Sequence, residues 1–299
     1  MARQRWTFKS QQGFFTHDDD PESWDFRATT RPFLGIKTRE YATDPEFDSK
    51  KESTQWQRLE HYVRHMNTLN PTQQRYKIFY IIRHGQGVHN VKYHEVGREE
   101  WDGYWSKLSG DGNVVWEDAE LTPFGKQQAE DIASFFGRGE VPLPDVIFSS
   151  PLRRCLGTTE IAYKNTLATV GDTSDSSRRP LVKEKLRERL GVHFCDKRST
   201  RSYITSAHPL FKIEVGFTEE DELWKADVRE TLDEHMFRAT QLLEDIFERG
   251  GDEVIVSLTA HSGALMALFG ATGWRKVPVA AGAVYPLLVV AEKVSTEVQ

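Results

Sequence analysis

Short apolar runs recur along the chain, and each of them ends in polar residues. The runs are KIFYII (77–82), DVIF (145–148), EVIVSLT (253–259) and residues 284–290, all rich in β-branched or aromatic residues. Such runs are typical of strands buried on both faces of a sheet. We therefore predict four core strands in the second part of the chain.

Between these strands the apolar positions take the spacing of amphipathic helices. Thr122 and Pro123 supply a cap and a first turn, and apolar residues follow at helical spacing up to Phe136. A second amphipathic helix is predicted at about residues 230–249. Alternation of strands and helices predicts an α/β domain with a mostly parallel sheet.

Residues 1–75 lack a comparable period and are polar with scattered aromatic residues. We interpret them as an N-terminal extension that packs on a domain formed by residues 76–299. Within that domain, two irregular segments at about 91–120 and 192–226 are predicted to be insertions. The first insertion contains an aromatic cluster that would either wall a pocket for an organic leaving group or form core for the N-terminal extension, with core favoured slightly because Trp is usually buried: Trp101, Tyr104, Trp105 and Trp116.

Composition narrows the possible classes of protein. The chain has 299 residues and a formal net charge of −6, which argues against a general nucleic-acid binder. Its two cysteines, Cys155 and Cys195, do not form a disulfide framework and are expected to be reduced. We find neither a signal peptide nor an apolar stretch of roughly 18 residues. We therefore expect a cytoplasmic protein that does not bind membranes.

Polar residues capable of catalysis or ligand binding follow three of the predicted strands. Arg83 and His84 follow the first, the segment 149–154 with Arg153 and Arg154 follows the second, and His261 follows the third. In open α/β sheets, ligands bind at this carboxyl edge. A neutral histidine is a nucleophile toward phosphorus, and arginines bind phosphoryl groups bidentately.

Each of these features alone has a structural explanation, since a strand-end histidine or an arginine pair at a helix start is common. Together they bring two histidines and at least two arginines to one edge. Arginines supply the charge that phosphoryl transfer needs without a metal, and no His/Asp/Glu cluster has convincing metal-ligand spacing. We therefore expect neither a metal nor a cofactor.

Four motifs in order carry a specific resemblance: RHG with Asn90 six residues after His84, SSPLRRCLGT, LRERLG and TAHSG. From about Ile78 to Val290 the chain resembles the histidine phosphatase superfamily, in the branch of cofactor-dependent phosphoglycerate mutases and fructose-2,6-bisphosphatases. It looks closest to fungal phosphomutase-like proteins, which share His89-Asn90 and a CDKR stretch like 195–198. The resemblance implies a three-layer α/β/α fold with a small helical insertion over the C-terminal edge of the sheet.

The resemblance also implies roles for individual residues. His84 would be the nucleophile that becomes phosphohistidine, and Glu188 would be the general acid. The phosphoryl oxygens would be held by Arg83, Asn90, Arg154 and His261, with Ser262 nearby. Glu188 lies among basic residues, so a place on a solvated charged face is its alternative. Asp196, Lys197 and Arg198 would lie either on the pocket rim or on ordinary surface.

The chain also departs from the mutases. They carry Glu two residues after the nucleophile, where this chain has Gln86, and their substrate segment rich in Arg, Tyr and Gly is missing. Hydrolysis of a small phosphorylated metabolite is therefore the leading hypothesis. A phosphomutase remains open, as does a phospho-ligand-binding or biosynthetic protein without hydrolytic turnover. The sequence does not indicate an oligomeric state.

Overall fold

The computed structural model describes residues 3–19, 27–171, 178–249 and 251–296; residues 20–26 of the predicted extension lie outside this description. The described part folds around one sheet with the strand order β1-β7-β2-β6-β3-β4-β5. The strands are β1 (Arg3–Gln11), β2 (Gln74–Arg83), β3 (Val146–Ser149), β4 (Leu181–Val182), β5 (Lys212–Ile213), β6 (Ile255–Ala260) and β7 (Val284–Thr296).

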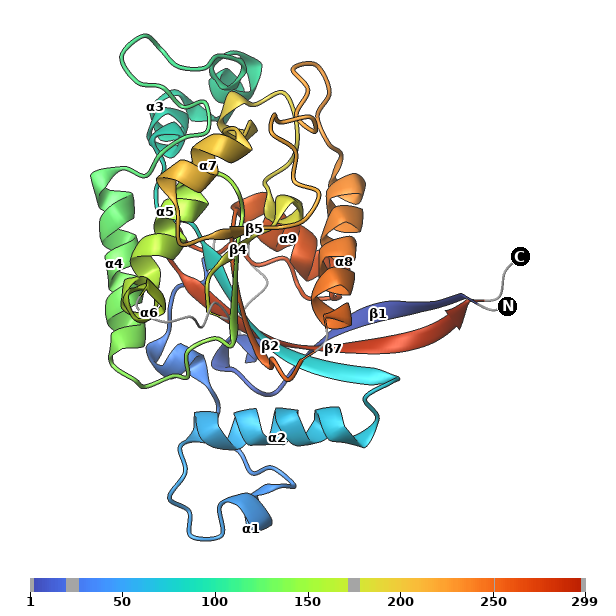
Figure 1. Ribbon diagram of the computed structural model, residues 1–299. Helices are drawn as coiled ribbons and strands as arrows, with labels where there is room; N and C mark the ends of the chain where they lie inside the picture. The colour runs from blue at the N-terminus through green and yellow to red at the C-terminus, as the bar shows by residue number, and fades with distance from the viewer. Residues whose placement is uncertain (1–2, 20–26, 172–177, 250, 297–299) are drawn as a thin grey trace.

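Helices cover both faces of this sheet (Figure 1). They are α1 (Asp44–Phe47), α2 (Gln55–Leu69), α3 (Val88–Gly103), α4 (Pro123–Gly137), α5 (Arg153–Ala162), α6 (Lys164–Gly171), α7 (Arg201–Ala207), α8 (Leu232–Glu248) and α9 (Ser262–Ala271). None of the helices in the described ranges has the length and apolar content to cross a membrane.

The sheet is mostly parallel, as predicted. β2, β6, β3, β4 and β5 run parallel, whereas β7 pairs antiparallel with β2 and β1 pairs antiparallel with β7. The four predicted strands are confirmed, and β1 adds a further strand on the outer side of β7. Residues 3–11 thus belong to the same sheet as β2, β3 and β6, whose ends carry the candidate site residues. The sequence analysis did not predict this strand.

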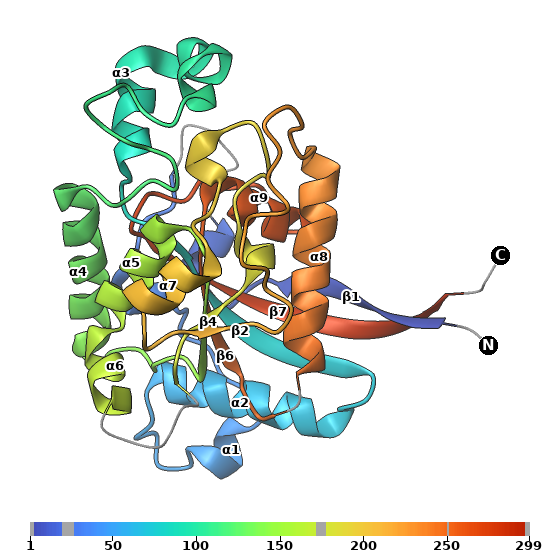
Figure 2. The same ribbon diagram turned by 45° about the horizontal axis from the view of Figure 1, so that its top comes forward.

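The two faces of β2 contribute to two separate apolar cores. Ile78, Tyr80 and Ile82 pack with residues of α2, α4 and α5, while Phe79 and Ile81 pack with α8 and α9. Figure 2 shows α4, α5 and α6 on one side of the sheet and α8 and α9 on the other. A sheet buried on both faces in this way is the middle layer of a three-layer α/β/α fold, which confirms the predicted fold class.

The predicted helix starts have the expected capping geometry. Thr122 Oγ1 accepts a hydrogen bond from the Gly125 amide at 2.9 Å, and Pro123 lies in the first turn of α4. At the start of α8, Thr231 and Glu234 form a capping box. These caps fix where the two helices begin relative to the sheet.

Two glycines bring the segment after β2 into contact with the start of α4. A Cβ on Gly85 would overlap the carbonyl oxygen of Gly125, and a Cβ on Gly125 would overlap the backbone of Gln86. Only glycine allows two backbones to approach this closely. The contact fixes the loop that begins at His84.

Candidate active site

The topology places three strand ends side by side. β6 lies between β2 and β3, and the amides of His84 and Ser150 extend the ladder by donating to Ala260 and Thr259, each at 3.0 Å. His84 follows β2, the Ser150–Arg154 turn follows β3, and His261 follows β6. The carboxyl edge therefore gathers the three motifs that the sequence analysis singled out.

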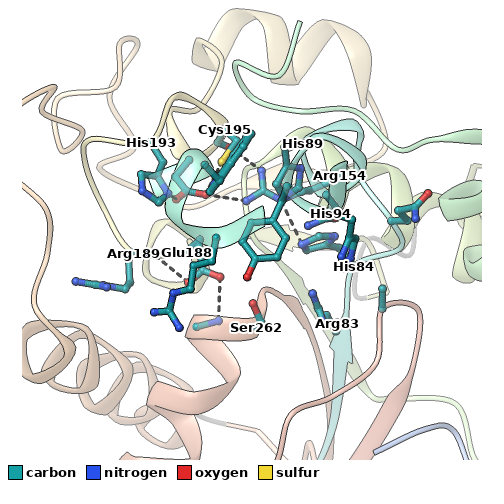
Figure 3. Close-up of a pocket in the computed structure, with 18 of the residues that line it drawn as sticks. Arg83, His84, His89, His94, Arg154, Glu188, Arg189, His193, Cys195 and Ser262 are labelled. Carbon is teal, nitrogen blue, oxygen red and sulfur yellow. Dashed lines mark hydrogen bonds and ion pairs between the residues drawn. The ribbon is translucent and has the colours of Figure 1, made fainter. Parts of the chain in front are cut away.

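Arg154 connects the two histidines. Its Nε–H donates to Nε2 of His84 at 3.3 Å and to Nδ1 of His261 at 3.2 Å. The centroids of the two imidazole rings are 5.1 Å apart. All three side chains are buried, and Figure 3 shows Arg154 directed at His84.

The hydrogen bonds assign one tautomer to each histidine. Nδ1 of His84 lies 2.6 Å from the carbonyl oxygen of Gly85, so it carries the proton and leaves a lone pair on Nε2. His261 has the opposite tautomer, since Nδ1 accepts from Arg154 while Nε2 donates to Ser150 Oγ at 2.7 Å. Both rings are neutral in this arrangement.

Burial and neighbouring cations favour the neutral rings. Burial lowers the pKa of His84 well below its usual value, and the charges of Arg154 and Arg83 lower it further. The pKa of His261 is also lowered by burial and by Arg154. His84 therefore keeps a nucleophilic Nε2 lone pair through the neutral pH range.

Arg154 is fixed by a residue that the sequence analysis placed only on a possible rim. Nη2 of Arg154 donates to Oδ1 of Asp196 at 3.0 Å, and Nη1 donates to the carbonyl oxygen of Cys195 at 2.6 Å. Asp196 is buried, and its Oδ2 accepts from Arg229 at 2.9 Å. Asp196 thus belongs to the site, whereas Lys197 pairs with Glu117 and Arg198 pairs with Glu184 away from it.

Glu188 lines the cavity on the side of α9. Its Oε2 accepts from the amide of Gly263 at 2.9 Å, and its Oε1 accepts from the amide of Arg189 at 3.0 Å. Figure 3 shows the carboxylate facing the start of α9, where Ser262 lies. Glu188 and Ser262 both line the cavity with His84. The alternative of a solvated charged face does not describe this half-buried carboxylate.

Arg83 and Asn90 reach the same cavity. Nη1 of Arg83 donates to the carbonyl oxygen of Val279 at 2.8 Å, while its buried Nε has no hydrogen-bond partner. Oδ1 of Asn90 accepts from the amide of Gly87 at 2.9 Å, at the start of α3. This bond leaves the amide nitrogen of Asn90 available to a ligand.

Arg153 lies elsewhere, although it belongs to the same motif as Arg154. Its guanidinium pairs with Glu120 and lies over the ring of Tyr203, 5.2 Å from the centroid. Successive residues of a helix point about 100° apart. Only one of the two arginines of the motif therefore enters the site.

The aromatic residues of the first insertion form a small core beside the site. Trp101 and Trp116 are buried together with Cys195, Trp105 packs against them, and Tyr104 is exposed. Trp101 also contributes to the cavity wall. Trp101 and Trp116 are thus buried as predicted, but the prediction of a core for the N-terminal extension is wrong, since the described residues of this core come from the insertions and the start of α3. Tyr104 belongs to no core in the described ranges.

The cavity above His84 has a volume of about 810 Å³. Ligand pockets usually have a volume of about 300–1,000 Å³, so there is room for an organic leaving group beyond the phosphoryl position. Arg98 and Phe124 line the cavity and are largely exposed, which shows that it reaches the surface.

One group of residues in the described ranges has the spacing of metal ligands, namely His193, Cys195 and Asp196. Both oxygens of Asp196 already accept from the guanidinium groups of Arg154 and Arg229. Burial raises the pKa of the Cys195 thiol well above its usual value. Two adjacent cations, an occupied carboxylate and a protonated thiol do not fit a metal ion.

Comparisons with known proteins identify the family of the chain. Residues 79–284 match the family described as histidine phosphatase superfamily (branch 1). A probable phosphoglycerate mutase of Arthroderma benhamiae is 39% identical over 95% of this chain and 84% of its own length. Phosphomutase-like protein 3 of Candida albicans is 39% identical over 74% of this chain and 68% of its own length.

Solved structures also match. The ecdysone phosphate phosphatase of Bombix mori in complex with tungstate is 19% identical with a TM-score of 0.43, covering 65% of this chain and 76% of its own. Mycobacterial glucosyl-3-phosphoglycerate phosphatase with VO3 is 24% identical with a TM-score of 0.37, covering 67% and 81%. On the family match and the two fungal relatives, the chain belongs to the histidine phosphatase superfamily, an enzyme family with phosphatase and mutase members.

Proposed function

We propose that the protein hydrolyses a small-molecule phosphomonoester through a phosphohistidine at Nε2 of His84. One observation carries this proposal. Nε2 of His84 is a neutral acceptor beside the Nε–H of Arg154, at the bottom of a cavity with room for an ester. A lone pair in this place is what attack on phosphorus requires.

In the first step Nε2 of His84 forms a bond to phosphorus while the bond from phosphorus to the ester oxygen breaks. Glu188, in its protonated form, donates a proton to the departing oxygen, which leaves as an alcohol. Arg83, Arg154 and the neutral amide nitrogen of Asn90 stabilise the charge on the phosphoryl oxygens.

In the second step a water molecule attacks the phosphohistidine. The Glu188 carboxylate takes a proton from this water, phosphate leaves, and Nε2 of His84 regains its lone pair. His261 is a neutral donor-acceptor held by Ser150, so it adds no second nucleophile. Each group ends the cycle in its starting state.

Two observations support hydrolysis over phosphate return to the same molecule. The cavity reaches the surface beside Arg98 and Phe124, so water has access to the phosphohistidine. Gln86 stands where mutases carry Glu, and its side-chain oxygen accepts from Thr122 at 2.9 Å. The names of the fungal relatives favour a phosphomutase as the second candidate.

The proposal is tested by phosphate release from a panel of phosphomonoesters in the presence of EDTA, with wild type and His84→Ala side by side. Release by the wild type that resists the chelator and is lost in the variant is the expected result. Isomer formation from a phosphoglycerate without net phosphate release would identify a mutase instead. Tight ligand binding without turnover, unchanged in His84→Ala, would identify a binding protein.

A further inference from the structure

Positive side chains outnumber negative ones on the wall of the cavity, whose carboxylates in the described ranges are those of Asp102, Glu188 and Asp196. Six arginines line it: Arg27, Arg83, Arg98, Arg154, Arg189 and Arg229. Arg98 pairs with Asp102, and Arg154 and Arg229 share Asp196. Among the described residues, the other three have no ion pair with an aspartate or glutamate.

Arg83 is next to His84 in the chain and serves the phosphoryl group, which leaves Arg27 and Arg189. The Nε and Nη2 of Arg189 donate to the carbonyl oxygen of Glu230. These bonds fix the position of the guanidinium group, but no carboxylate in the described ranges forms an ion pair with it. Arg27 is exposed and has no hydrogen bond or ion pair within the described ranges. Two guanidinium groups are thus available to a second anion.

The backbone beside Arg27 is fixed against the active site. The amide of the buried Ala28 donates to Pro278, and the Ala28 carbonyl accepts from Ala280, each at 2.8 Å. The intervening Val279 carbonyl is the acceptor for Arg83. One short segment therefore holds both Arg83 and the residue that follows Arg27.

The charges of Arg27 and Arg83 act on each other. Burial lowers the pKa of Arg83, and the positive charge of Arg27 adds to this effect. The Glu188 carboxylate of the same cavity offsets part of the charge at Arg83, and a phosphoryl group bound beside His84 would compensate more of it. Arg27 lines the same cavity and is exposed, so an anion that pairs with it would lie nearer the mouth of the cavity than the phosphoryl group.

We infer that Arg27 is a specificity-determining residue that binds a second anionic group, phosphate or carboxylate, on the leaving-group part of the substrate, with Arg189 as a further cation of the same cavity. The preferred substrates are then phosphomonoesters that carry another acidic group. This inference rests on the proposed function. Arg27 lies outside residues 79–284, which match the family, so this recognition is supplied by the N-terminal part of the chain.

Three esters that share a 6-phosphate test the inference: glucose 6-phosphate, 6-phosphogluconate with an added carboxylate, and glucose 1,6-bisphosphate with an added phosphate, with product analysis to count only cleavage at the 6-phosphate. We expect kcat/KM of the wild type to rise about tenfold with at least one of the added anions, and Arg27→Gln to remove most of this preference. The two diacids show which anion is bound. Added KCl should weaken the preference, because salt screens exposed charges.

Arg138→Gln is the matched control, since Arg138 is half exposed, pairs with Glu140 and does not line the cavity. It should keep the wild-type preference. Equal kcat/KM of the wild type for all three esters would overturn the inference, as would a preference that survives in Arg27→Gln.

Calorimetric binding of the same three esters to His84→Ala, with and without Arg27→Gln, separates this inference from the proposed function. If no ester is hydrolysed, the proposed function fails, while the binding data still decide the role of Arg27. If the esters are hydrolysed but the diacids bind no more tightly, the inference alone fails.

Discussion

The carboxylate of Asp196 holds the guanidinium of Arg154 at 3.0 Å, and neither side chain is more than 3% exposed. Through this ion pair a residue of the second insertion fixes the arginine that contacts both His84 and His261. The insertion thus completes the centre of the site as well as covering it.

Asp196→Asn should lower kcat at least tenfold with a smaller effect on KM, because Arg154 loses its counter-charge and its fixed orientation. Breaking a buried ion pair also costs about 3 kcal/mol of folding free energy. Steady-state kinetics and urea unfolding of the same preparation check both effects.

Asp118→Asn is the control for this change. Asp118 is equally buried, but it accepts from the amides of Arg153 and Ser199 instead of an arginine side chain. Its substitution should affect stability and leave kcat largely unchanged. A folded Asp196→Asn variant with wild-type kcat would show that Asp196 has only a structural role.

Glu188→Gln should slow hydrolysis of alkyl phosphates by about 100-fold or more, since general acid catalysis contributes roughly 10²–10⁴. The loss should be much smaller for p-nitrophenyl phosphate, whose leaving group departs without a proton. The ratio of kcat/KM for the two esters is the measurement. An equal loss on both esters would contradict the assignment of Glu188 as the acid.

Gly263→Ala should reproduce part of the Glu188→Gln phenotype, because a Cβ at position 263 would overlap the Glu188 carboxylate. The Glu188 carboxylate would have to move, and it would lose the hydrogen bond that it accepts from the amide of residue 263. We expect the same dependence on the leaving group, with little change in stability. Wild-type rates on alkyl phosphates would show that the position of Glu188 does not matter.

Gly85→Ala should destabilise the fold by about 1–3 kcal/mol, the usual range for overpacking, because the added Cβ would overlap the Gly125 backbone. Gly103→Ala is the matched control, since a Cβ at Gly103 meets nothing within 4 Å. Chemical denaturation of both variants checks the difference. Equal stability would mean that the loop after His84 adapts freely.

Acidification should destabilise the protein between pH 6.5 and 5. Burial lowers the pKa of His17 to about 3 and of His235 to about 4, and it lowers those of His84, His89 and His261 as well. Below pH 6.5 these histidines bind protons in the unfolded chain but not in the folded one. Each histidine therefore lowers the free energy of unfolding by up to about 1.4 kcal/mol for each unit by which the pH falls.

Urea unfolding at several pH values measures how steeply the free energy of unfolding depends on pH. His235→Gln should reduce this slope by the contribution of up to one proton, about 1.4 kcal/mol per pH unit. Burial raises the pKa of Asp118, so this group acts in the opposite direction, because the folded chain binds its proton more readily than the unfolded chain. It offsets the contribution of one histidine at most. A free energy of unfolding that stays constant from pH 7 to pH 5 would contradict the prediction.

The sequence predicted the core of the fold because the buried strands have a distinctive composition. β4 and β5 contain two residues each, which is too short for any pattern. β1 was missed although its residues 5–10 alternate, with Trp6 and Phe8 buried and Arg5, Thr7 and Lys9 exposed. That alternation is the signal of a strand.

The site was predictable as far as it follows the strand ends. His84, Arg154 and His261 come from motifs that adjacent parallel strands bring together. Asp196 and Arg27 come from irregular segments, so their approach depends on how those segments pack. The sequence therefore predicted the centre of the candidate site better than the residues that orient it and extend it.

The pairing of β1 with β7 has a consequence for biosynthesis. Arg3 pairs with Thr296 and Gln11 pairs with Leu288, so nearly the full length of the chain separates partner strands. During translation, β1 leaves the ribosome long before its partner strand β7 has been made. The aromatic residues Trp6 and Phe8 lack their native cover throughout this interval, so the nascent chain should depend on chaperones that bind exposed apolar segments.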